Sequence, residues 1–229
     1  MRSPRVVSLV PSATETLRAW GVEPVAVTRF CPTPHPRTVG GTKDPHVDEI
    51  AALRPDVVVM CIEENRREDA DDLTERGLAV HAIDIDGVDD VVSELVRLAE
   101  ALQLEVDVPA LPDPRPSRGV TAFVPIWRRP WMTISAATYA ASMLRWVGIG
   151  VVTPASEERY PTVELSDVID LGPDVVIAPD EPYPFGERHR QELEQVAPTI
   201  FVDGQDLVWW GTRTPEALGR LDAVLSRLP

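Results

Sequence analysis

The sequence predicts an α/β protein with two lobes of similar plan, each built on a mostly parallel sheet. Short apolar runs of strand length alternate with helical patterns along the chain, which is typical of a parallel sheet with crossover helices. Several segments of the first half recur in the second half. The length of 229 residues accommodates two lobes of about 100 residues each.

In the first half, apolar runs predict strands over residues 6–10, 25–28, 57–61 and 78–83, and periodic segments predict helices over 12–21, 47–53 and 69–76. Ser12 and Glu15 have the spacing of a capping box, which places the start of the first helix at Ser12. The proline-rich segment 29–45 lies between two of these elements. A loop of this length in a small domain is usually functional or disordered.

A longer helix is expected over residues 88–104. Val91, Leu95, Leu98 and Leu102 recur at spacings of four, three and four, which form one apolar face. Residues 108–117 contain four prolines and predict a stiff linker. The expected organisation is an N-terminal α/β lobe over residues 1–87, a bridging helix and linker over 88–117, and a C-terminal α/β lobe over 118–229.

Three echoes support the two-lobe plan. Leu53-Arg54-Pro55-Asp56-Val57 resembles Leu171-Gly172-Pro173-Asp174-Val175, at an offset of 118. The strand that ends at Asp84 resembles the strand that ends at Asp203, and residues 17–22 resemble 144–149. Three echoes in one order favour an internal repeat over chance.

Aromatic side chains concentrate after the predicted strands of the second half. An apolar run at 120–124 predicts a strand, residues 136–148 predict a helix, and the loop between them carries Trp127 and Trp131 with two arginines and two prolines. Ligands bind at the carboxyl ends of strands in open α/β sheets, so this loop is expected to form one wall of a small-molecule cleft. The other aromatic residues in expected loops are Phe30, Tyr160, Tyr183, Phe185, Trp209 and Trp210.

Composition excludes several classes of partner. The formal net charge of −15 disfavours nucleic acid and anionic membrane surfaces. No apolar run is long enough to span a bilayer, so membrane insertion is not expected. No signal peptide is visible at the start of the chain, which predicts a cytoplasmic protein, with a periplasmic or cell-surface location as the alternative if a leader was removed.

Reactive side chains form no established catalytic or metal-binding spacing, so no enzyme activity, resident cofactor or bound metal ion is expected. Cys31 and Cys61 lie at the carboxyl ends of predicted strands, and either could contact a ligand or act as a nucleophile, although inert thiols are favoured. Glu181 lies on an expected cleft loop and could orient a polar group of a ligand. Arg128 and Arg129 could receive an anionic group or remain a surface pair.

The sequence resembles the helical-backbone metal receptor family, the class III substrate-binding proteins of cobalamin, haem and iron-siderophore ABC transporters, and is most similar to the cobalamin branch. The resemblance covers nearly the whole chain. It rests on Val7-Ser8-Leu9-Val10-Pro11-Ser12-Ala13-Thr14-Glu15, Val39-Gly40-Gly41, Leu53-Arg54-Pro55-Asp56, Val124-Pro125-Ile126-Trp127, Tyr160-Pro161 and Pro173-Asp174-Val175-Val176.

The resemblance implies two Rossmann-like lobes joined by one long helix, with the ligand held between them. By position, Phe30 matches an aromatic wall residue, while Thr42 and Cys61 stand where the cobalamin branch has tryptophans. Trp131 and Tyr160 match aromatic ligand contacts of the second lobe. The segment from Trp209 to Arg213 matches a ligand-proximal loop.

The expected ligand is a corrinoid or another metal chelate, bound by a carrier without an export signal. Two alternatives are a conventional ABC-transporter receptor without its leader, and a small-molecule enzyme that uses Cys31 or Cys61. Family members dock a permease through an acidic residue on each lobe. Asp48 fits the first docking position, whereas Ser166 occupies the second and Asp167 lies beside it.

Overall fold

The computed structural model describes residues 3–34, 37–226 and 228. The chain divides into two compact units: unit 1 comprises residues up to 85 together with 90–110 and 210–213, and unit 2 comprises 86–89, 111–209 and residues from 214 onward. The chain therefore passes from one unit to the other more than once. Each unit is an α/β sandwich with its own sheet, as the sequence predicts.

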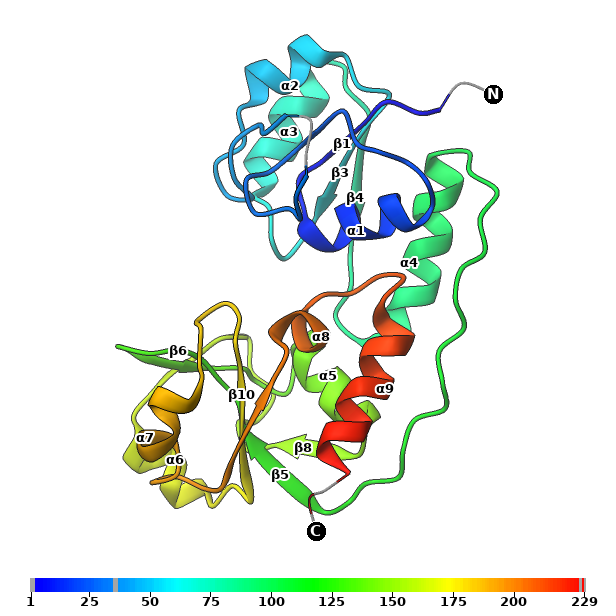
Figure 1. The fold of residues 1–229 in the computed structure, drawn as a ribbon. Helices are drawn as coiled ribbons and strands as arrows, with labels where there is room; N and C mark the ends of the chain where they lie inside the picture. The colour runs from blue at the N-terminus through cyan, green and yellow to red at the C-terminus, as the bar shows by residue number, and fades with distance from the viewer. Residues whose placement is uncertain (1–2, 35–36, 227, 229) are drawn as a thin grey trace. The chain divides into compact units, whose positions relative to one another are not determined.

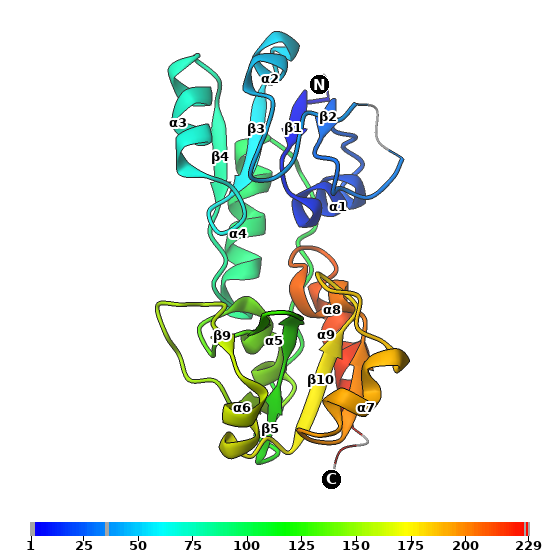
Figure 2. The same ribbon diagram turned by 90° about the vertical axis from the view of Figure 1, so that its left-hand side faces the viewer.

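Unit 1 contains a four-stranded parallel sheet with the order β2-β1-β3-β4. Figure 2 shows these strands side by side, and in Figure 1 helices α2 and α3 lie on one side of them. Ile50 of α2 and Leu73 of α3 are fully buried against Val7, Val58 and Met60 of the sheet. The elements are β1 (Val6–Ser8), α1 (Pro11–Ala19), β2 (Ala26–Val27), α2 (Val47–Leu53), β3 (Val57–Cys61), α3 (Arg67–Glu75), β4 (Val80–Ile83) and α4 (Val88–Ala101).

Unit 2 has a second four-stranded parallel sheet with the order β11-β10-β5-β8. A small antiparallel sheet, β6-β7-β9, adjoins it. In Figure 1, α5 and α9 lie on one side of β5 and β10, with α6 and α7 on the other. The elements are β5 (Val120–Phe123), β6 (Pro125–Trp127), β7 (Trp131–Thr133), α5 (Tyr139–Trp146), β8 (Ile149–Val151), β9 (Thr162–Val163), α6 (Leu165–Leu171), β10 (Val175–Pro179), a 3-10 turn η1 (Glu187–His189), α7 (Arg190–Leu193), β11 (Thr199–Val202), α8 (Gly204–Val208) and α9 (Thr214–Leu225).

The internal repeat predicted from the sequence is confirmed by topology and by local geometry. Counted along the chain within each unit, both parallel sheets have the strand order second, first, third, fourth. The helix before the third strand ends at Arg54 in unit 1 and at Gly172 in unit 2, both in the left-handed conformation, with φ of 46° and 65°. In both units the aspartate after the following proline accepts a backbone hydrogen bond from the start of the first strand: Asp56 from the Arg5 N–H just before β1 at 2.8 Å, and Asp174 from the Thr121 N–H of β5 at 2.7 Å.

The helix expected over residues 88–104 is confirmed as α4, although it ends at Ala101 and its residues from 90 onward belong to unit 1. Val91, Leu95, Leu98 and Leu102 are all buried, so the predicted apolar face is the packed face. The backbone N–H of Val88 donates to Ser142 Oγ of unit 2 at 3.0 Å, which fixes the first turn of the helix. Residues 108–117 form no helix or strand, as their prolines predict.

Three local predictions are wrong. The first helix starts at Pro11, and no side chain caps it, so Ser12 and Glu15 form no capping box. Proline suits the first helical position because its missing N–H would have no intrahelical partner there. The segment with Trp127 and Trp131 is a β-hairpin rather than a loop. The helix expected over 136–148 begins at Tyr139, because Thr138 caps it by accepting from the Ala141 N–H at 3.2 Å.

Candidate ligand-binding surfaces

The carboxyl ends of the strands in unit 1 are held together by one buried side chain. Asn65 accepts a hydrogen bond from the Cys61 N–H at 2.8 Å and donates to Thr42 O at 2.8 Å and to Leu9 O at 3.4 Å. It therefore links the segments that follow β1 and β3 to the segment around Thr42. We call the surface formed by Phe30, Thr42, Ile62 and Glu64 the unit 1 strand-end surface.

Two large apolar side chains of this surface are exposed, Phe30 at 56 % and Ile62 at 60 %. Phe30 is held in place by its neighbour. The Arg29 guanidinium lies 4.8 Å from the centre of the Phe30 ring, and it makes a forked ion pair with Asp44 at 3.0–3.1 Å. The ring is therefore a pre-positioned apolar contact rather than a freely rotating side chain.

Both cysteines are buried. The Cys31 thiol packs against the hydroxyls of Thr14 and Thr28, at 3.1 and 3.2 Å. Burial raises the pKa of the Cys61 thiol to about 12, and the nearby Glu64 carboxyl adds to this effect. A thiol in this state is a poor nucleophile at neutral pH, because the thiolate is the reactive form.

The β6–β7 hairpin in unit 2 carries an aromatic cluster. Trp131 stacks on Phe185 with ring centres 6.0 Å apart, and Trp127 meets Tyr183 edge-on at 5.5 Å. Trp127 remains 44 % exposed, whereas Phe185 is buried. Tyr183, which itself packs on Phe185 with ring centres 4.7 Å apart, therefore supports the exposed Trp127 ring.

The two arginines of the β6–β7 hairpin, Arg128 and Arg129, differ in their surroundings. Arg128 pairs with Glu192 at 2.9 Å, and this hydrogen bond holds the pKa of the guanidinium above its usual value. Arg129 lies at the tip of the hairpin with φ of 66° and is exposed. The anion-binding role considered for the pair therefore falls to Arg129, since Arg128 already has a carboxylate partner.

Tyr160 and Glu181 lie on other segments of unit 2. Tyr160 is 37 % exposed, and its neighbour Arg159 pairs with Asp86 at 2.5 Å. Glu181 is half-buried in the segment that follows β10, and Gln205 donates a hydrogen bond to it at 3.2 Å. We call the surface formed by Trp127, Trp131, Tyr160 and Glu181 the unit 2 aromatic surface.

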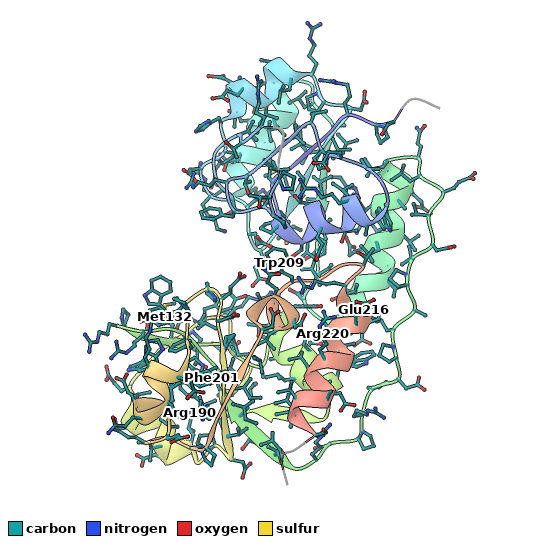
Figure 3. The ribbon with its side chains drawn as sticks, viewed as in Figure 1. Met132, Arg190, Phe201, Trp209, Glu216 and Arg220 are labelled. Carbon is teal, nitrogen blue, oxygen red and sulfur yellow. The ribbon has the colours of Figure 1, made fainter. Side chains whose placement is uncertain are left out.

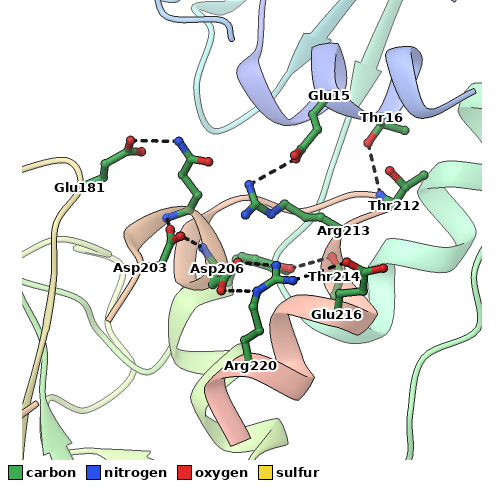
Figure 4. Close-up of polar contacts among 12 residues, drawn as sticks. Glu15, Thr16, Glu181, Asp203, Asp206, Thr212, Arg213, Thr214, Glu216 and Arg220 are labelled. Carbon is green, nitrogen blue, oxygen red and sulfur yellow. Dashed lines mark hydrogen bonds and ion pairs between the residues drawn. The ribbon is translucent and has the colours of Figure 1, made fainter. Parts of the chain in front are cut away.

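The segment from Trp209 to Arg213 is shared between the units. Trp209, labelled in Figure 3, belongs to unit 2 and follows α8. The buried Asp206 fixes α8 to Arg220 of α9 with two hydrogen bonds of 2.7 Å (Figure 4). Trp210 belongs to unit 1 and is only 3 % exposed, which makes it a packing residue.

The remaining part of this segment packs on α1. Figure 4 shows Arg213 paired with Glu15 at 3.3 Å and the Thr212 N–H bonded to Thr16 Oγ at 3.3 Å. Gly211 has φ of 122°, and a β-carbon there would collide with Thr16 Oγ. The segment therefore requires glycine at this position.

The positions expected to dock a permease lie on corresponding helices. Asp48 is in the first turn of α2, is 90 % exposed and pairs with Arg76 at 2.5 Å. Asp167 is exposed in the first turn of α6, beside Ser166. With the repeat offset of 118, Asp48 corresponds to Ser166 and Glu49 corresponds to Asp167.

The structure thus places Phe30 and Thr42 on unit 1, where Asn65 connects Thr42 to the buried Cys61, and it places Trp127 and Trp131 on unit 2. Ile62, Glu64 and Asn65 were not predicted as site residues. The only signal for them was their position directly after the strand that ends at Cys61. Across residues 3–34, 37–226 and 228, no cluster of three or more potential ligands could hold a metal ion. In the same ranges no helix is both long enough and apolar enough to cross a bilayer.

No protein-family model matches the chain. Among curated proteins, the vitamin B12-binding protein of Salmonella choleraesuis (strain SC-B67) is 29 % identical over 101 residues, which cover 42 % of this chain and 38 % of that protein. The corresponding protein of Salmonella paratyphi A is 30 % identical over the same extent. The match thus spans less than half the length of these relatives.

Solved structures match over nearly the whole chain. The periplasmic vitamin B12-binding protein BtuF of Vibrio cholerae superposes with a TM-score of 0.76 at 18 % identity, covering 97 % of this chain and 96 % of that one. The periplasmic haem-binding protein BhuT, crystallised with two haems, gives a TM-score of 0.75 at 18 % identity and covers 98 % of both chains. The comparisons thus show that the chain has the two-lobed α/β fold of these periplasmic binding proteins, as the resemblance implies.

Proposed function

We propose that the protein is a substrate-binding protein for a planar metal chelate, a corrinoid or a haem-like macrocycle. The observation that carries the proposal is the match in fold, over nearly the full length, to binding proteins for vitamin B12 and for haem. The exposed rings on the strand-end segments of both units support it. Flat rings offer a large contact area to a macrocycle at little cost in conformational entropy.

Each unit contributes contacts of a different kind in this proposal. The unit 1 strand-end surface contributes Phe30 and Ile62, which cover apolar parts of the ligand. The unit 2 aromatic surface contributes Trp127, Trp131 and Tyr160. Thr42, Glu181 and Arg213 supply the polar contacts, whereas Cys31, Cys61 and Trp210 act through packing because they are buried.

The test is an equilibrium titration of tryptophan fluorescence with cyanocobalamin, haemin and a ferric siderophore. We expect saturable quenching by one of them, weakened at least tenfold by Trp127→Ala. Trp146→Phe is the matched control. Trp146 is the last residue of α5, outside the unit 2 aromatic surface, and its indole N–H donates to the Pro112 carbonyl oxygen at 2.9 Å. Absence of saturation with every ligand, at concentrations up to millimolar, would refute the proposal.

A role without catalysis is part of the same proposal. The solved structures that match are binding proteins, and the Cys61 thiol is held protonated by burial. Replacing both cysteines with serine should therefore leave ligand affinity within about threefold of the original. Turnover of a bound ligand that disappears in the double variant would support the enzyme alternative instead.

We further propose that Asp48 and Asp167 contact the permease of an ABC transporter. Both are exposed acidic residues in first helical turns at corresponding ends of the two units. The test is co-purification with ABC-transporter permeases of the host, with Asp48→Asn and Asp167→Asn compared with Asp71→Asn on the surface of α3. Fractionation of host cells decides between a periplasmic receptor and a carrier in the cytoplasm.

A further inference from the structure

Glu64 presents a half-buried carboxyl group on the unit 1 strand-end surface. It follows β3 by three residues and is half-buried between the exposed Ile62 and the buried Asn65. Within the part of the chain that the structure describes, no side chain or N–H donates a hydrogen bond to this carboxyl. Its position on the unit 1 strand-end surface leaves it available to a ligand.

The charged groups around Glu64 do not neutralise it. Glu63 is a like charge, and the single nearby cation is the Lys43 ammonium, which donates to the Glu63 carbonyl at 2.9 Å. The third titratable neighbour is the buried Cys61 thiol. Burial raises the pKa of Glu64 to about 7, with a further contribution from Glu63 and opposition from Lys43. A lone carboxyl in such a place is most stable when uncharged.

We propose that Glu64 is a specificity residue that binds the ligand as a neutral carboxylic acid, donating its hydroxyl hydrogen to a carbonyl or carboxamide oxygen. The proposal rests on the binding function proposed above and names the polar group that the ligand must present to unit 1. The apolar contacts of Phe30 and Ile62 would lie beside this hydrogen bond, as in other small-molecule sites where a few polar groups fix orientation.

Ligand chemistry sets the sign of the pH dependence. A neutral acceptor binds only the protonated form of Glu64, so affinity is constant below pH 6 and falls as pH rises through about 7. The limiting slope is about tenfold per pH unit if the ionised form does not bind. A cationic ligand group would select the carboxylate and give the opposite slope.

Titration of fluorescence quenching between pH 5.5 and 8.5 tests the proposal, with a ligand whose own absorption is constant over that range. Glu64→Gln keeps a neutral donor and should retain affinity at every pH, removing the decline. Glu64→Ala should bind at least fivefold more weakly at pH 5.5 and show a flat profile. Glu63→Gln is the control and should keep the decline with its midpoint moved to lower pH, because one repelling charge is lost.

A second measurement does not depend on the ligand. The side-chain carboxyl of Glu64, followed by NMR in the free protein, should titrate near pH 7, and a midpoint below 5 would overturn the proposal. Binding that is independent of pH and unchanged in Glu64→Ala would also overturn it while leaving the binding function intact. Failure of every ligand to bind at pH 5.5 would instead overturn the binding function, and with it this role for Glu64.

Discussion

Asn65 is the residue whose replacement should most disturb the unit 1 strand-end surface. Its side chain is 7 % exposed, and it makes two hydrogen bonds of 2.8 Å and one of 3.4 Å to three separate backbone segments. Asn65→Ala removes all three and leaves the Cys61 N–H and the Thr42 carbonyl without these partners. No other side chain within hydrogen-bonding distance replaces them in the described part of unit 1.

The magnitude follows from the two short bonds. Each contributes about 1 kcal/mol net, and each buried backbone group left unsatisfied adds a cost of similar size, so Asn65→Ala should lower the free energy of unfolding by about 2–4 kcal/mol. With a urea dependence of about 2 kcal/mol per molar, the midpoint should fall by about 1–2 M. Affinity for the ligand should fall as well, because the segments that carry Thr42 and Glu64 lose their common anchor.

Two variants sharpen this test. Asn65→Asp keeps the acceptor for the Cys61 N–H, but at neutral pH it places a carboxylate oxygen against the Thr42 carbonyl. It should therefore be less stable at pH 8 than at pH 5, where its protonated form can donate. Glu68→Ala, an exposed change on α3, is the control. A urea midpoint of Asn65→Ala within about 0.3 M of the control, which corresponds to about 0.6 kcal/mol in the free energy of unfolding, would refute the reasoning.

Three further outcomes are expected. Gly172→Ala should lower the free energy of unfolding by about 1 kcal/mol, measured by urea titration. Arg54→Gly, at the matching left-handed position of unit 1, should raise it by about 0.5–1 kcal/mol. A change in stability of the same sign in both variants would contradict the repeat. The hydrogen bond from the Thr121 N–H lowers the pKa of Asp174, so the stability that the Asp174 carboxylate provides is present above about pH 4 and is lost as pH falls below that value. Asp174→Asn should therefore make the melting temperature less sensitive to acid. Asp44→Ala should weaken ligand binding severalfold by releasing the support of Phe30, and unchanged quenching would exclude that support.

Much of the fold could be predicted because its signals are local. The apolar face of α4 follows from the spacing of Val91, Leu95, Leu98 and Leu102, and burial of these residues confirms it. The repeat was visible in the sequence because both units have the same turn before the third strand. In each turn a residue in the left-handed conformation, Arg54 or Gly172, is followed by Pro and Asp. The hairpin at Trp127 was missed because its two short strands lie among prolines and arginines, which are typical of loops.

Packing decided the roles of individual aromatic and acidic residues. Trp209 and Trp210 are adjacent and chemically alike, yet one lies half-exposed in unit 2 and the other is buried in unit 1. Glu63 and Glu64 are equally alike in sequence, yet the Lys43 ammonium donates to the Glu63 carbonyl, whereas burial raises the pKa of the Glu64 carboxyl. Sequence spacing carries no information on which of two neighbouring side chains becomes desolvated.

The sequence by itself determined the α/β class, the duplicated plan and the family resemblance, because these depend on hydrophobic period and turn chemistry within short segments. Tertiary structure alone decided which side chains the strand ends present: it exposed Phe30, Ile62 and Trp127, buried both cysteines, and placed the Glu64 carboxyl where none of the described residues donates a hydrogen bond to it. Burial is a property of contacts between segments far apart in the chain, so it appears only when the segments are brought together.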